Sequence, residues 1–448
     1  VFIGVDAGGN VSTGNMNIGI GYNAFHNAAT GDNNIAIGVS AGDAITSGDE
    51  NIFIGTDAGG TTTAGTHIVA IGRKAGEANI TTDGSYSVFI GGFAGNQITS
   101  GIGNVAIGYA ALDAEDDGDY NTAIGYEALT DQTGVSGTVG NTAVGYRAGD
   151  DITTGKQNTF IGAFAADAAQ DVDSAIAIGY AAMSGGNVTS DADGTIAIGD
   201  VALTALTSGI GNVAIGRSAL AAEDDGDYNT AVGFEAFNKQ TGTSGLVANT
   251  GLGYRAGYYN TTGTKNTYIG YHSGFGVSSN ANGSNTGVGY RSLFAVTTGG
   301  SNTALGESAG SSITTASGSV IIGMDTGNTI TTGNMNIAIG HDAMSGGTVT
   351  SDNNIAIGRS AGDALTSGRG LNVFIGKDAG GAITSGVENV IIGANAAGND
   401  VDAGNCIAIG SGVTGVTHNT VTLGNADVTD VYMSQDSGAL AHAADVKP

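Results

Sequence analysis

The amino-acid sequence predicts an all-β protein, a parallel β-solenoid (β-roll) of about 25 coils with a 17-residue repeat and two short strands per coil. A motif of the form Asn-x-Ala/Phe-Ile-Gly recurs from one end of the chain to the other, and hydrophobic residues, 40% of the total, recur with it. A 17-residue unit cannot bury its own apolar face, whereas stacked copies of the unit can. The repeat therefore predicts stacked coils rather than several globular domains.

The composition agrees with a repeated, tightly turning structure. Glycine accounts for 81 of 448 residues, with one proline and no tryptophan. Collagen would need glycine at every third position together with much proline, and neither is present. The regular spacing of the hydrophobic residues also argues against disorder.

The first predicted strand of each coil ends at the motif glycine. Of the 24 intervals between these glycines, 16 are 17 residues and the others range from 14 to 20. Insertions therefore fall in the turns and leave the strand unchanged. The glycines are at 4, 21, 38, 55, 72, 91, 108, 125, 145, 162, 179, 199, 216, 233, 253, 270, 289, 306, 323, 340, 358, 376, 393, 410 and 424.

Three positions around the motif glycine form columns along the repeat. The residue before it is Ile, Val or Leu in all 25 copies, the residue four before it is Asn in 17 of 24, and the residue three after it is Ala in 20 of 25. Stacked Asn side chains are expected to hydrogen-bond along the coil axis. A looser segment such as ITSG at 45–48 predicts the second strand.

The motif strand is apolar on both sides. We expect its first and third residues to point into the coil, which leaves the middle residue, as at Ala106, Ala123 and Ala143, on the outer face. Strands that are apolar on both sides are usually buried on both sides. The outer face is thus expected to be covered by other copies, with a homotrimer favoured. The alternative is a monomer whose coil curvature or turns cover the row.

The charge and cysteine content exclude several classes. Thirteen Lys and Arg against 41 Asp and Glu give a net charge of −28, which argues against nucleic acid or an anionic membrane as partner. No apolar run approaches the roughly 18 residues that span a bilayer. The single cysteine, Cys406, excludes an intrachain disulfide framework. The six histidines show no metal-ligand spacing; they are His26, His67, His272, His341, His418 and His442.

Two acidic turns, both AEDDGDYN, at 114–121 and 222–229, are the candidate metal sites. Several carboxylates near a glycine suit Ca²⁺. The EF-hand spacing fails, however, because Ile124 falls where the bidentate Glu belongs. A solvated acidic turn is the favoured interpretation, with Ca²⁺ as the candidate ion.

Aromatic residues directly after the motif glycine predict a ladder. Stacked rings could bind sugars, but packing between coils is the favoured interpretation. The residues of this aromatic ladder are Tyr22, Tyr109, Tyr126, Tyr146, Tyr180, Phe234, Tyr254, Tyr271 and Tyr290.

Cys406 occupies the Asn column and is interpreted as a substitution in the Asn ladder.

At NIAIGVSAG, NVAIGYAAL and NTAVGYRAG the sequence resembles the heads of trimeric autotransporter adhesins, and it is similar to the repeat shafts of phage tail fibres. The resemblance covers about 1–424. Segment 425–448 leaves the repeat and is similar to the segment that, in many tail fibres, leads into a self-cleaving chaperone domain that assembles the trimer. The opening VFIG lacks its usual Asn, which predicts an upstream part.

The resemblance implies a non-enzymatic, extracellular structural fibre on a virion surface: a stiff trimeric shaft that presents a receptor-binding tip. A bacterial surface adhesin is the alternative, and a fibre-borne glycan-degrading enzyme is the second. A cell-surface receptor or glycan is then the candidate partner besides other copies of the chain. No catalytic or cofactor-binding residue is assigned.

Overall fold

The computed structural model describes residues 1–27, 30–81, 85–133, 136–242, 244–277, 280–398 and 400–428. The chain falls into two compact units, the first comprising Val1–Arg291 with Val296–Thr298 and the second Ser292–Ala295 with the chain from Gly299 onward. Within the described residues the regular structure consists of short parallel strands and a three-residue 3₁₀ helix, η2 (Ser190–Ala192). None of these residues forms a helix long and apolar enough to cross a membrane.

The motif strands form one parallel ladder in each unit, which confirms the predicted β-solenoid. In the first unit they are β1 (Phe2–Ile3), β2 (Ile18–Ile20), β3 (Ile35–Ile37), β4 (Ile52–Ile54), β5 (Val69–Ile71), β6 (Val88–Ile90), β7 (Val105–Ile107), β9 (Thr122–Ile124), β11 (Thr142–Val144), β12 (Thr159–Ile161), β13 (Ile176–Ile178), β14 (Ile196–Ile198), β15 (Val213–Ile215), β17 (Thr230–Val232), β19 (Thr250–Leu252), β20 (Thr267–Ile269) and β21 (Thr286–Val288). In the second unit they are β22 (Thr303–Leu305), β23 (Val320–Ile322), β24 (Ile337–Ile339), β25 (Ile355–Ile357), β26 (Val373–Ile375), β27 (Val390–Ile392), β28 (Ile407–Ile409) and β29 (Val421–Leu423).

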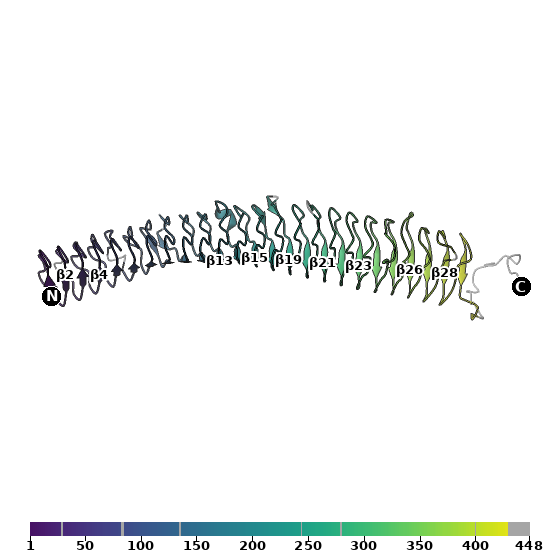
Figure 1. Cartoon of the computed structure of the whole chain (residues 1–448), viewed down its shortest axis with the longest axis horizontal. Helices are drawn as coiled ribbons and strands as arrows, with labels where there is room; N and C mark the ends of the chain where they lie inside the picture. Colours follow the sequence, from purple (N-terminus) through teal and green to yellow (C-terminus); the bar gives the residue numbers. More distant parts are fainter. Residues whose placement is uncertain are drawn as a thin grey trace, which may run out of the picture. The chain divides into compact units, whose positions relative to one another are not determined.

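Within each unit, consecutive motif strands pair in parallel and in register. Between β3 and β4, for example, Ile35 lies opposite Ile52 and Ala36 opposite Phe53. Figure 1 shows successive coils in each unit, with their strands aligned along the same side. Of the predicted non-repeat segment 425–448, only 425–428 lie within the described residues.

The second segment of each coil differs from the predicted second strand. Within the described residues it is extended and paired only at β8 (Gly118–Asp119) with β10 (Gly137–Thr138), at β16 (Gly226–Asp227) with β18 (Gly245–Leu246), and at isolated bridges. Elsewhere it turns, although its backbone still bonds to the next coil, as from Thr46 N to Thr63 O at 2.8 Å. Left-handed residues stand close on either side of it, such as Gly42 and Glu50 around the segment 45–48, so that only a short stretch of backbone can be extended.

The prediction that the first and third strand residues point into the coil is wrong. The middle residues Ala106, Ala123 and Ala143 are fully buried, whereas the third residues Ile37 and Ile124 are each 36% exposed. Strand alternation places the two sets on opposite sides but does not determine which side is inside. Ala106, Ala123 and Ala143 therefore belong to the core.

The interior is narrow, which explains why the middle residue faces it. Phe53 of β4 fills one cross-section, and a Cβ atom on Gly59 would lie 2.5 Å from its ring. The rest of the interior is lined by the column of small Ala residues, such as Ala41, and by the buried Ile45 of the second segment. Each fully buried Ile or Phe contributes roughly 1.5–3 kcal/mol.

The predicted Asn ladder is confirmed. Asn34 is fully buried; its Nδ2 donates to Gly48 O at 2.8 Å and its Oδ1 accepts the backbone N–H of Asn51 at 2.9 Å. The same pattern recurs in both units, as at Asn104 and Asn372. Each Asn thus satisfies a buried turn carbonyl and a backbone N–H of the next coil.

The motif glycine is required by the close approach of neighbouring coils. Gly216 has φ of +135°, and a Cβ on it would lie 2.4 Å from the carbonyl oxygen of Gly233 in the next coil. Most other motif glycines share this geometry; at Gly55, for example, φ is +136° and the added Cβ would lie 2.5 Å from the carbonyl oxygen of Gly72. No L-residue fits this position without moving the coils apart.

We predict that Gly216→Ala destabilises the coils around β15 by more than about 2 kcal/mol, because it combines left-handed strain with a backbone clash. Hydrogen exchange of the β14, β15 and β17 amides measures the loss. The control is Gly194→Ala, at φ +69° with no atom within 4 Å of the added Cβ, for which about 1 kcal/mol is expected. Equal effects of the two variants would contradict the close-approach explanation.

We predict that Asn372→Ala costs about 2 kcal/mol or more, since it leaves the carbonyl of Gly386 and the N–H of Asn389 unpaired in the interior. Asn336→Ser should cost less. A serine in this column, Ser319, already accepts the N–H of Asn336 through its hydroxyl at 3.3 Å. Local hydrogen exchange compares the two variants, and a larger loss for the serine variant would refute the ladder's role.

Candidate functional site

The two acidic turns are built around a buried glutamate. Glu115 is fully buried, and its Oε1 accepts the backbone N–H groups of Asp116, Asp117 and Gly118 at 3.0, 3.2 and 2.8 Å. Its Oε2 accepts a hydrogen bond from Gln132 of the next coil. The Glu115 carboxylate therefore stabilises the turn in which it lies.

The glutamate begins a polar chain that crosses the coil interior. Gln132 Oε1 accepts from Asn141 Nδ2 at 3.0 Å, and Asn141 belongs to the Asn ladder. The second acidic turn repeats the arrangement with Glu223, Gln240 and Asn249, where Asn249 Nδ2 donates to Gln240 Oε1 at 2.9 Å. Both acidic turns thus carry the same buried network.

The acidic turns keep three carboxylates close together. Ligand atoms of Glu115, Asp116 and Asp117, and of their counterparts Glu223, Asp224 and Asp225, lie within 4.8 Å of one another. A pocket of about 310 Å³ beside the second turn is lined in part by Asp191, Asp225 and Asp227. Because the glutamate oxygens already accept hydrogen bonds, the geometry favours a structural turn over the Ca²⁺ interpretation, which stays an untested prediction.

Burial controls the ionisation of both glutamates. It raises the pKa of Glu115 and of Glu223, and this effect outweighs the hydrogen bonds from Gln132, Gln240 and the turn N–H groups, which lower it. The folded protein therefore holds these protons more tightly than the unfolded chain does.

Seven of the nine aromatic residues that follow a motif glycine form two stacked ladders in the first unit, whereas Tyr180 meets Phe164 edge-on. Ring centroids are 5.3 Å apart for Tyr109 and Tyr126 and 5.4 Å for Tyr126 and Tyr146. A second ladder joins Phe234, Tyr254, Tyr271 and Tyr290 at 5.0–5.4 Å. An inner ring such as Tyr126 has both faces covered by its neighbours, so only ring edges face solvent. This geometry favours packing between coils over sugar stacking.

Cys406 lies in the Asn column, as predicted. It is buried, and its backbone N–H donates to Oδ1 of Asn389 at 2.9 Å. Its position therefore needs no reactive thiol to explain it.

Several histidines pair with carboxylates across coils. His67 Nε2 lies 3.0 Å from Glu50 Oε2, and His418 Nε2 lies 3.9 Å from Asp402 Oδ1. His26 instead contacts the backbone oxygen of Asp6, and His272 packs among aromatic rings. His442 lies outside the described residues.

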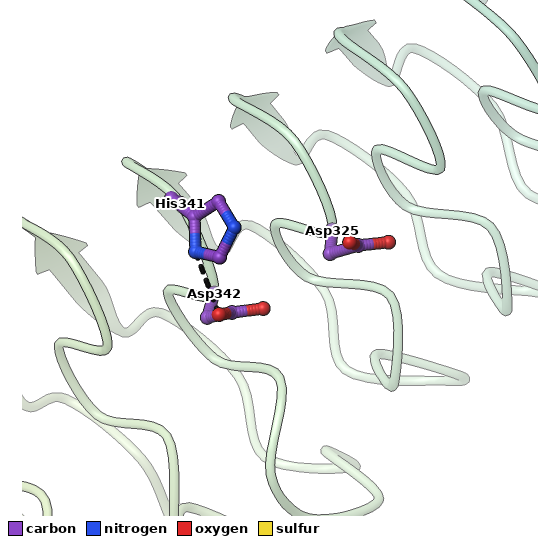
Figure 2. A group of neighbouring side chains, drawn as sticks. All are labelled: Asp325, His341 and Asp342. Carbon is purple, nitrogen blue, oxygen red and sulfur yellow. Dashed lines mark ion pairs between the residues drawn. The ribbon is translucent and has the colours of Figure 1, made fainter.

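Three side chains that sequence spacing did not connect come together in the second unit. His341 and Asp342 follow β24, and Asp325 follows β23 in the preceding coil. Figure 2 shows the two aspartates extending in the same direction, with the imidazole beside them. His341 Nδ1 is 2.6 Å from Asp342 Oδ2, and ligand atoms of all three residues lie within 4.8 Å of one another. The sequence contains one signal for this cluster: Asp325 and Asp342 are separated by one repeat, which places them at equivalent positions on neighbouring coils.

Comparisons of the chain with protein-family models, with curated proteins and with solved structures return no match.

We predict that the stability of the first unit rises as the pH is lowered from 8 toward the ordinary pKa of glutamate, near 4.5. Since the folded-state pKa values are raised, this contribution is present in acid and is lost as the pH rises through them. The double variant Glu115→Gln, Glu223→Gln should show a flatter pH dependence in denaturant unfolding. An unchanged slope would show that these glutamates titrate normally.

Proposed function

We propose that this chain is a non-enzymatic structural element of an extracellular fibre, in which copies of the chain associate through the outer face of the motif sheet. The observation that carries the proposal is the composition of that face. The third residue of every described three-residue motif strand is Ile, Val or Leu, and the first is Ile, Val or Thr, so no charge interrupts the face.

The outer face is apolar in a chain that is otherwise strongly acidic. Its third residues include Ile161 at 39%, Leu252 at 47% and Leu305 at 48% exposure. Soluble monomers seldom expose contiguous apolar patches of more than a few hundred Å². Covering the exposed part of each such side chain contributes on the order of 1 kcal/mol, and the contribution recurs at every coil.

Other copies of the same chain are the partners that fit this face. The face repeats once per coil, so a second copy offers matching side chains at the same interval. Three copies around a common axis close the association without leaving an unpaired face. The surface that joins the copies is thus formed by the first and third residues of the motif strands. The row of middle Ala and Phe residues, which the sequence predicted to be that surface, lies inside the coil.

A stiff spacer is the function that this arrangement supports. Within each unit, backbone hydrogen bonds join consecutive motif strands and the Asn ladder adds side-chain bonds, while the outer face joins the copies. The resemblance to phage tail fibres favours a virion shaft that presents a receptor-binding tip, with a bacterial surface adhesin as the alternative. An upstream virion-attachment segment in the gene supports the first, and a downstream membrane-anchoring barrel supports the second.

We predict that the chain sediments as a trimer and that Ile107→Glu combined with Ile124→Glu dissociates it, because charges would enter the apolar face. Mass measurement by sedimentation or light scattering gives the assembly state, and circular dichroism checks that the coils remain folded. The control is Val401→Glu, an aliphatic residue that is 52% exposed away from the motif strands, which should leave the trimer intact. A monomeric wild type would refute the proposal.

A further inference from the structure

We propose that Asp325, His341 and Asp342 form a binding site for one divalent transition-metal ion of the Zn²⁺ class, which links two consecutive coils of the second unit. The set combines one imidazole nitrogen with carboxylates from two coils (Figure 2). Imidazole with carboxylate suits Zn²⁺, Co²⁺ and Ni²⁺, whereas Mg²⁺ and Ca²⁺ prefer oxygen ligands alone.

The distances are compatible with a single ion. Ligands about 2.0–2.2 Å from a metal lie roughly 3–4.4 Å from one another. The three side chains here offer atoms within 4.8 Å, and His341 Nδ1 already lies 2.6 Å from Asp342 Oδ2. Small side-chain rotations therefore suffice, and water completes the coordination.

The backbone holds the two aspartates in equivalent positions. Both have left-handed backbone, with φ of 52° at Asp325 and 58° at Asp342. The N–H of Asp342 donates to Met324 O at 3.3 Å, and the hydroxyl of Thr326 donates to Gly340 O, so the two turns are bonded to each other beside the site. The carboxylates are thus positioned before any ion binds.

Asp325 and Asp342 occupy the second position after the motif glycine, and the charges at this position differ between the site and the first unit. In the first unit, two glutamates at the second position after the motif glycine each pair with an arginine of the next coil: Glu235 Oε2 lies 2.5 Å from Arg255 Nε, and Glu127 Oε2 lies 3.8 Å from Arg147 Nε. Asp325 and Asp342 are instead two acids on adjacent coils, and the described ion pairs join neither of them to Lys or Arg. A bound cation would offset this repulsion.

The test is Zn²⁺ titration of the full chain, produced without a polyhistidine tag, by calorimetry in excess Mg²⁺, with Co²⁺ absorption as the spectroscopic readout. Wild type should bind one equivalent, and His341→Ala and Asp325→Asn should each weaken binding by about tenfold or more. The matched control is His67→Ala, which removes a His–carboxylate pair of similar exposure that lacks a second acid; it should bind like wild type.

Two results would overturn the proposal. One is the absence of a stoichiometric Zn²⁺ site in the wild-type chain. The other is Zn²⁺ binding and a Co²⁺ spectrum that are unchanged in both His341→Ala and Asp325→Asn. Because both substitutions are at the surface, circular dichroism should show unaltered coils, and Asp325→Asn keeps the size of the side chain.

Discussion

The close, in-register approach of each coil to the next is the constraint on which the rest of the structure depends. At the motif glycine the backbones come so near that the added Cβ of an alanine at Gly108 would lie 2.1 Å from the carbonyl of Gly125. This contact fixes the register of the parallel ladder, and the register brings equivalent residues of consecutive coils side by side. Every column in the molecule follows from it.

The columns use this spacing in different ways according to their chemistry. Inside, Ala and single aromatic rings fill a narrow core, and the Asn side chains satisfy buried backbone groups. Outside, tyrosine rings such as Tyr254 and Tyr271 stack at 5.0 Å, and Glu235 meets Arg255. The same stacking that favours like aromatic neighbours also brings like charges together, as at Asp325 and Asp342, where the contact is unfavourable unless a cation offsets it.

Buried polar groups show how the repeat tolerates variation. Tyr268 occupies a middle strand position that is usually Ala or Phe, and its hydroxyl donates to Asn282 Oδ1 at 2.7 Å inside the coil. Glu115 is likewise accommodated because its turn and Gln132 satisfy both oxygens. Longer coils, such as that from Gly125 to Gly145, leave the pairing of the motif strands unchanged.

The repeat, the parallel solenoid, the Asn ladder and the place of Cys406 in that ladder can all be predicted from the sequence, because each depends on residues that recur at one interval. The sequence did not determine which side of the strand is inside. Ala106 and Ile107 are both apolar, and the alternation of side chains along a strand does not show toward which of its two faces the coil closes. Nor did it reveal the Asp325, His341 and Asp342 cluster, since these ligands lie on two coils. Only the tertiary structure decided these points, because it fixes which way each coil curves and which side chains the stacking brings within reach.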